Sequence, residues 1–182
     1  MQSCTSSHIE CTGSVSIKQR SKKIRFYPTS EQKQVLKQWF GVCRYFYNKT
    51  LHDLNYKNHD IDYESSMHQT YLEPKYPTTN YIDEARRIFA NVPEWSKDVP
   101  YQSKRLAIKQ CCDAVKNAKI KYKNSKQIQK VKFKSKKNTK ESIYIPKSAV
   151  SELGIYYTKL GILKFAEPVG KVKYDCRLLI EY

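Results

Sequence analysis

Apolar residues follow a helical spacing between residues 30 and 56. A spacing of three to four residues is typical of an amphipathic helix, and here it is carried by Leu36, Trp39, Phe40, Cys43, Phe46, Tyr47, Leu51 and Leu54. Thr29 and Gln32, three residues apart, predict a capping box at the helix start. Gly41 interrupts the helix at a cost of about 1 kcal/mol relative to alanine, so we expect another element to pack close to it.

A short strand is predicted immediately before this helix. Residues 23–27 include the β-prone Ile24, Phe26 and Tyr27. Pro28 ends the strand, because proline has no N–H to donate to a sheet ladder.

Two more helices are predicted in the central part of the chain. One lies near residues 80–91, with apolar residues on one face and Thr79 placed to cap its N-terminus. The other lies near residues 101–123, where an apolar line includes the stem of Lys104 and the other faces carry lysines.

The remainder of the chain has β character. Lys130–Phe133 and Ile143–Ile145 are strand-like, and Pro146 ends the second of them. Later strand-like stretches, separated by glycine and proline, are 154–157, 161–165 and 171–181. The order of strand, helices and strands predicts an α+β fold in which the first strand pairs with one after Val131.

Positive charge is the strongest compositional signal. The chain has 34 Lys and Arg against 17 Asp and Glu, a net charge of +17, which indicates a polyanionic partner because bound phosphates release counterions. The densest tract, 121–140, has nine lysines and no acidic residue. Acidic residues instead gather between Asp53 and Glu94, so we expect that segment to face away from nucleic acid. An acidic membrane surface is the alternative polyanion, but no 18-residue apolar run or lipidation signal supports it.

Metal and thiol chemistry find little support. The six cysteines include no Cys-x-x-Cys pair, and the four histidines complete no zinc pattern. Asp60 and Asp62 lack the glycine and terminal glutamate of a calcium loop. No secretory signal is visible, so we expect an intracellular protein with free thiols, no metal and no cofactor.

The N-terminal pattern resembles the TnpB/OrfB family of transposon-encoded proteins, which are related to type V CRISPR effectors. The matching residues are Phe26, Tyr27, Pro28, Thr29, Gln32, Leu36, Gly41, Arg44, Tyr47 and Asn48. Three later stretches are also similar to the family, namely Val99–Ala118, Lys132–Pro146 and Lys159–Phe165.

The resemblance implies a particular domain organisation. A three-helix recognition lobe is inserted after the first strand of a small antiparallel OB-like barrel, the wedge domain. Residues 1–21 would be a disordered arm, 22–28 the first barrel strand, 29–125 the helix-turn-helix-type recognition insertion, and 126–182 the remaining barrel strands.

The resemblance also implies binding of guide RNA and DNA in connection with transposition. In the family a RuvC-like nuclease domain with three acidic metal ligands follows, and its signature is absent here. We therefore expect no catalysis by this chain alone. Two alternatives stay open: a non-functional remnant of a truncated transposon gene, or one half of a split RNA-guided endonuclease whose nuclease half is a separate polypeptide.

Ten residues are predicted to contact nucleic acid. Arg44 and Asn48 lie four apart on one edge of a helix, and this pair suits phosphate and base-edge contacts. They could instead serve the fold, with Arg44 paired to a carboxylate from segment 53–94 and Asn48 capping a neighbouring helix. The others belong to the lysine-rich stretch: Lys119, Lys121, Lys123, Lys130, Lys132, Lys134, Lys136 and Lys137.

Overall fold

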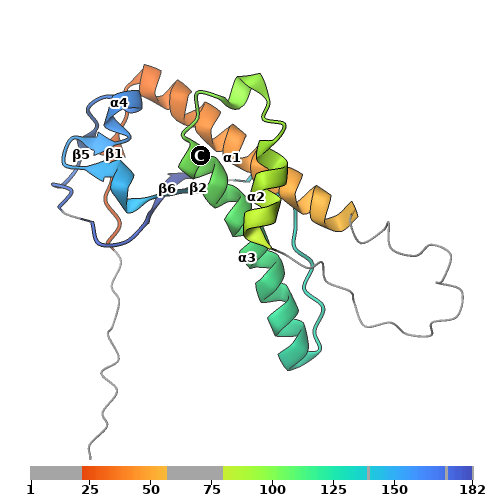
Figure 1. Ribbon diagram of the computed structural model, residues 1–182. Helices are drawn as coiled ribbons and strands as arrows, with labels where there is room; N and C mark the ends of the chain where they lie inside the picture. Colours follow the sequence, from red (N-terminus) through yellow and green to blue (C-terminus); the bar gives the residue numbers. More distant parts are fainter. Residues whose placement is uncertain (1–21, 57–79, 139, 171, 182) are drawn as a thin grey trace, which may run out of the picture.

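Three helices form the body of the molecule in the computed structural model, which describes residues 22–56, 80–138, 140–170 and 172–181 (Figure 1). They are α1 (Ser30–Tyr56), α2 (Tyr81–Phe89) and α3 (Tyr101–Ser125). Helix α1 packs against α3, and α2 packs mainly on α3. These ranges confirm the three helices predicted from the apolar spacing.

Helix α1 begins with the predicted capping box. The Thr29 N–H donates to Gln32 Oε1 at 2.9 Å, and the Gln32 N–H donates to Thr29 Oγ1 at 3.2 Å. The Gln32 amide also donates to the carbonyls of Leu160 and Ile162, at 2.8 and 3.0 Å. One side chain therefore helps to start α1 and ties it to the C-terminal part of the chain.

The hydrophobic core lies mainly between α1 and α3. Side chains from these two helices that are at most 1% exposed include Trp39, Phe46, Leu54, Ile108 and Cys111. Burying a large apolar side chain contributes about 1.5–3 kcal/mol, so this contact is the main source of stability for the helices. The spacing of apolar residues in the sequence identified these positions correctly.

Two helix details differ from the predictions. The N-cap of α2 is Asn80, whose side-chain oxygen accepts from the Ile82 N–H at 3.1 Å, so the predicted cap was wrong; Thr79 itself lies outside the described residues. Asparagine is a strong N-cap and here directly precedes the first helical residue. At Gly41 an added Cβ would meet nothing closer than a nitrogen of Arg44 at 3.9 Å, so no other element requires glycine there.

The described strands form three separate two-stranded antiparallel sheets. The pairs are β1 (Phe26–Tyr27) with β5 (Lys164–Phe165), β2 (Lys140–Ile145) with β6 (Cys176–Glu181), and β3 (Val150–Ser151) with β4 (Gly154–Ile155). The β1–β5 pair confirms that the first strand joins one that follows the helices, although β1 is shorter than predicted. The fold is α+β, but no sheet in the described residues closes into a barrel, so the OB-like barrel is not confirmed.

Other parts of the β prediction were partly right. Ile143–Ile145 is the end of β2. Residues 130–133 form no strand, so that prediction was wrong. The stretch 154–157 begins as β4 but leads into the helical turn α4 (Tyr157–Leu160). Short 3-10 turns occupy Glu94–Ser96 and Lys147–Ala149.

Candidate nucleic-acid interface

The last two turns of α3 extend beyond the core. Ala118 is the last buried residue of this helix, which continues to Ser125 and ends at Lys126 in the left-handed conformation, with φ of 57°. Figure 1 shows this end of α3 projecting away from the other helices. The chain then turns back toward α1 and α3. Residues 119–133, from the exposed end of α3 to Phe133, are called the basic arm below.

The basic arm is positively charged along its whole length. Its lysines are all exposed, and they are Lys119, Lys121, Lys123, Lys126, Lys130 and Lys132. Between Asp113 and Glu141 the sequence has eleven lysines and no acidic residue. A concentration of like charges produces a field that attracts anions, which makes the arm a candidate surface for a polyanion.

Asn48 of α1 fixes the point where the arm returns to the body. Its amide nitrogen donates to the Lys134 carbonyl at 2.9 Å, and its Oδ1 accepts from the Lys134 N–H at 2.8 Å. Val131 also packs against the core. At Lys134 a side chain of α1 therefore makes the two backbone hydrogen bonds that a neighbouring strand could make.

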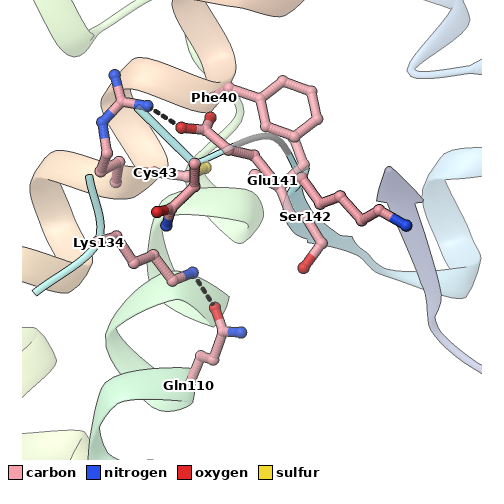
Figure 2. A pocket seen from close by; sticks show the side chains of 10 residues that line it. Phe40, Cys43, Gln110, Lys134, Glu141 and Ser142 are labelled. Atoms are coloured by element: carbon pink, nitrogen blue, oxygen red, sulfur yellow. Dashed lines mark hydrogen bonds and ion pairs between the residues drawn. The ribbon is translucent and has the colours of Figure 1, made fainter. Parts of the chain in front are cut away.

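The side chain of Lys134 points into the molecule. Its Nζ donates to Gln110 Oε1 of α3 at 2.7 Å and lies 4.4 Å from the centre of the Tyr47 ring of α1, a cation–π contact. Figure 2 shows the ammonium group directed at Gln110. Burial lowers the pKa of Lys134. The ammonium group therefore links α1 and α3 instead of extending into solvent.

Arg44 forms an ion pair at the same place. Its Nη1 donates to Glu141 Oε1 of β2, and the two side chains are only 20% and 10% exposed. The pairing supports the structural alternative for Arg44, but the carboxylate comes from β2 and not from segment 53–94. Asn48 likewise holds a loop and does not cap a helix. We call Arg44, Asn48, Lys134 and Glu141 the junction.

A small pocket opens beside the junction (Figure 2). Its volume is about 120 Å³, well below the roughly 300 Å³ at which ordinary small-molecule sites begin. Cys43 lines it, and burial raises the pKa of this thiol to about 12, which leaves it protonated and poorly nucleophilic at neutral pH. The pocket is too small for a nucleotide and offers no activated thiol.

Acidic side chains of α1 and α2 are used to hold those helices together. Arg87 donates to Asp53 at 2.9 Å and to Glu84 at 2.5 Å. Burial raises the pKa of Asp53, but hydrogen bonds from Lys49, Arg87 and His52 outweigh this effect and hold the pKa below its usual value. Most of the acidic segment, residues 57–79, lies outside the described residues, including Asp60 and Asp62, so its orientation stays a prediction.

The ten predicted contact residues fall into two groups. Arg44, Asn48 and Lys134 meet at the junction. The other seven are exposed lysines on or next to the basic arm: Lys119, Lys121, Lys123, Lys130, Lys132, Lys136 and Lys137. The sequence prediction missed Gln110 and Glu141, because they lie 24 and 97 residues from the side chains they bind and give no local signal.

Within the described ranges, no three His, Cys, Asp or Glu side chains are grouped so that they could hold a metal ion. None of the described helices has the length and apolar character needed to span a membrane.

Comparison with known proteins bears on the N-terminal part of the chain. Residues 18–60 match a family model that is described as a helix-turn-helix domain and named for OrfB of IS605. The matched range covers β1, the capping box, and Arg44 and Asn48 of α1. A search of curated proteins finds no match, and no catalytic domain is matched. Over residues 18–60, the comparison therefore supports an N-terminal region of the TnpB/OrfB, IS605-type family.

Proposed function

We propose that this protein binds nucleic acid through the basic arm, as the DNA- and RNA-binding part of a TnpB-like transposition protein. The observation that carries the proposal is the projecting arm, whose lysines are exposed and have no acidic residue in the same stretch of chain. The helix-turn-helix match at residues 18–60 supports DNA as one ligand. No catalytic step is assigned to these residues.

The chemistry of the arm suits guide RNA as well as DNA. Lysine ammonium groups neutralise phosphates without reading base sequence, and both polymers carry the same phosphate chain. In this proposal the three small sheets correspond to the wedge barrel of TnpB-like proteins, and the antiparallel pairing of β1 with β5 supports that correspondence.

The junction has a supporting role in this proposal. Asn48 holds the backbone of Lys134, the residue that directly follows the arm. Arg44 holds Glu141 at the start of β2. The family-like residues of α1 therefore position the arm, and the lysines of the arm contact phosphate.

Charge reversal on the arm tests the proposal. A variant with Lys119, Lys123, Lys130 and Lys132 changed to Glu is compared with the wild type in binding assays on a DNA duplex and an RNA of equal length. Each lost phosphate contact removes about 0.7–0.9 from the slope of log affinity against log salt. We expect the affinity at about 0.1 M salt to fall at least roughly 100-fold, because four such contacts are lost and four repulsive charges are added.

The matched control carries the same change in charge elsewhere. Lys33, Lys37, Lys147 and Lys164 are also exposed, and their change to Glu should alter affinity much less. Equal losses in the two variants, or an unchanged salt slope in the arm variant, would show that the arm is not the binding surface. Thermal unfolding of both variants checks that they remain folded.

A further inference from the structure

Phe133 is an exposed aromatic side chain on the basic arm. It is 53% exposed, and Ile120 and Ile128 of the same arm are 54% and 69% exposed. Phe133 lies between Lys132 and Lys134 in the sequence. An aromatic ring of this size usually contributes to a core, so its position among charged residues indicates a surface that can accept a partner.

The backbone around Phe133 is anchored on both sides. Val131 packs against the core, and the N–H and carbonyl of Lys134 are bound to Asn48. Both neighbours in this short segment are held, yet the Phe133 ring itself faces solvent. A side chain presented on a fixed backbone loses little conformational entropy when it binds, which favours affinity.

The charges around the ring favour nucleic acid as the occupant. Lysine is depleted in protein–protein interfaces, whereas the stretch from residue 114 to 140 contains eleven lysines and no acid. Surfaces that bind single strands combine a positive groove along the backbone with aromatic side chains on which bases stack. The arm has exposed lysines and an exposed aromatic ring, that of Phe133.

We infer that the Phe133 ring is a stacking platform for an unpaired base, so that the preferred ligand of the arm is single-stranded nucleic acid. The lysines beside it, such as Lys130 and Lys132, neutralise the flanking phosphates. A base within a duplex has no open face for the ring, so the inference separates single strands from duplexes. It rests on the proposed binding function of the arm and adds the ligand class.

Binding of defined oligonucleotides tests the inference. Fluorescence anisotropy is measured with oligo-U RNA, oligo-dT DNA and a DNA duplex of equal length, on wild-type protein and on Phe133→Ala, Phe133→Trp and Tyr174→Ala. Base–aromatic stacking corresponds to a loss of roughly 5-fold to 150-fold in affinity when the ring is removed. We expect Phe133→Ala to show such a loss on single strands and less than about a twofold change on the duplex.

The two other variants serve as controls. Phe133→Trp keeps an aromatic face and should bind single strands as well as the wild type, with quenching of its tryptophan fluorescence. Tyr174 is 65% exposed and lies outside the arm, so Tyr174→Ala should leave all three affinities unchanged. If Phe133→Ala loses affinity only for oligo-U or only for oligo-dT, the result also supports the inference and identifies RNA or DNA as the stacked strand.

Several outcomes would overturn the stacking inference. Phe133→Ala that binds single strands as tightly as the wild type would exclude stacking, and so would equal losses on single strands and duplex. Stacking would also be excluded if Phe133→Trp bound single strands as weakly as Phe133→Ala. In these cases only the stacking inference fails, provided that wild-type binding still depends on salt and on the lysines of the arm. If the wild type binds none of the three ligands, the proposed function fails.

Discussion

Arg44 and Asn48 at the junction and the lysines of the basic arm were all predicted to bind nucleic acid, but the structure uses their polar groups differently. Arg44 and Asn48 bind Glu141 and the Lys134 backbone, so their hydrogen-bonding groups serve the fold. The lysines of the arm are exposed and belong to a stretch without acidic residues. The difference teaches that a recognisable helix motif can be occupied by contacts within the fold, while a less distinctive run of lysines stays exposed.

The two regions are nevertheless connected. Asn48 holds the residue that follows Phe133, and Lys134 reaches back to Tyr47 and Gln110. A change at the junction should therefore lower stability directly and alter binding through the position of the arm. A change to an exposed lysine or to Phe133 on the arm should lower binding alone.

Removal of the Asn48 side chain should give the largest stability effect at the junction. Asn48→Ala leaves the N–H and carbonyl of Lys134 without their partner in a partly buried position, and each such group costs about 1–3 kcal/mol. We expect the free energy of unfolding to fall by roughly 2–4 kcal/mol in chemical denaturation. The matched control is Asn55→Ala, an exposed asparagine on the same helix, which should change it by less than about 0.5 kcal/mol. A stable Asn48→Ala variant with weakened binding would instead place Asn48 in the interface.

Breaking the Arg44–Glu141 ion pair should cause the next largest decrease in the free energy of unfolding. Its side chains are mostly shielded from water, so removing one partner leaves the other charge without compensation. Arg44→Ala and Glu141→Ala should each lower the free energy of unfolding by about 1–3 kcal/mol. In the double variant the free energy of unfolding should fall by less than the sum of the two single decreases, because the second change removes the uncompensated charge. Additive losses in this double-mutant cycle would show that the pair does not couple α1 to β2.

Replacement of Gly41 by alanine should have the smallest effect on stability, and it should raise stability instead of lowering it. An added Cβ would meet only an Arg44 nitrogen at 3.9 Å, which is ordinary contact. Alanine is favoured over glycine in a helix by about 1 kcal/mol, so Gly41→Ala should raise the free energy of unfolding by up to about that amount. Affinity for nucleic acid should stay the same. Reduced affinity with increased stability would bring this face of α1 into the interface.

Features with local signals were predictable from the sequence. The capping box of Thr29 and Gln32 and the apolar spacing of α1 and α3 depend on neighbours within a few turns. Strand β2 ends just before Pro146, as predicted. The strand predicted at 130–133 was wrong: these residues form no strand. The next residue, Lys134, is held by the Asn48 side chain, 86 residues away, and no local pattern reveals that contact.

The candidate site was predictable only in part. Charge density alone indicated the lysine-rich tract 121–140, and the structure leaves its lysines exposed except Lys134. Charge density could not indicate that Lys134 turns inward, because that orientation depends on Tyr47 and Gln110 from two different helices. The exposure of Phe133 was not predicted, because an apolar residue in a strand-like stretch is normally expected to be buried.

Direct mapping of the contact surface tests the central claim, that nucleic acid lies along the basic arm. The wild-type chain is cross-linked by light to a single-stranded oligonucleotide that carries photoreactive bases, and the modified residues are identified by mass spectrometry. The account predicts cross-links within residues 119–133, with Phe133 prominent, and none at Arg44 or Asn48. Cross-links at Arg44 and Asn48 with an unmodified arm would contradict it.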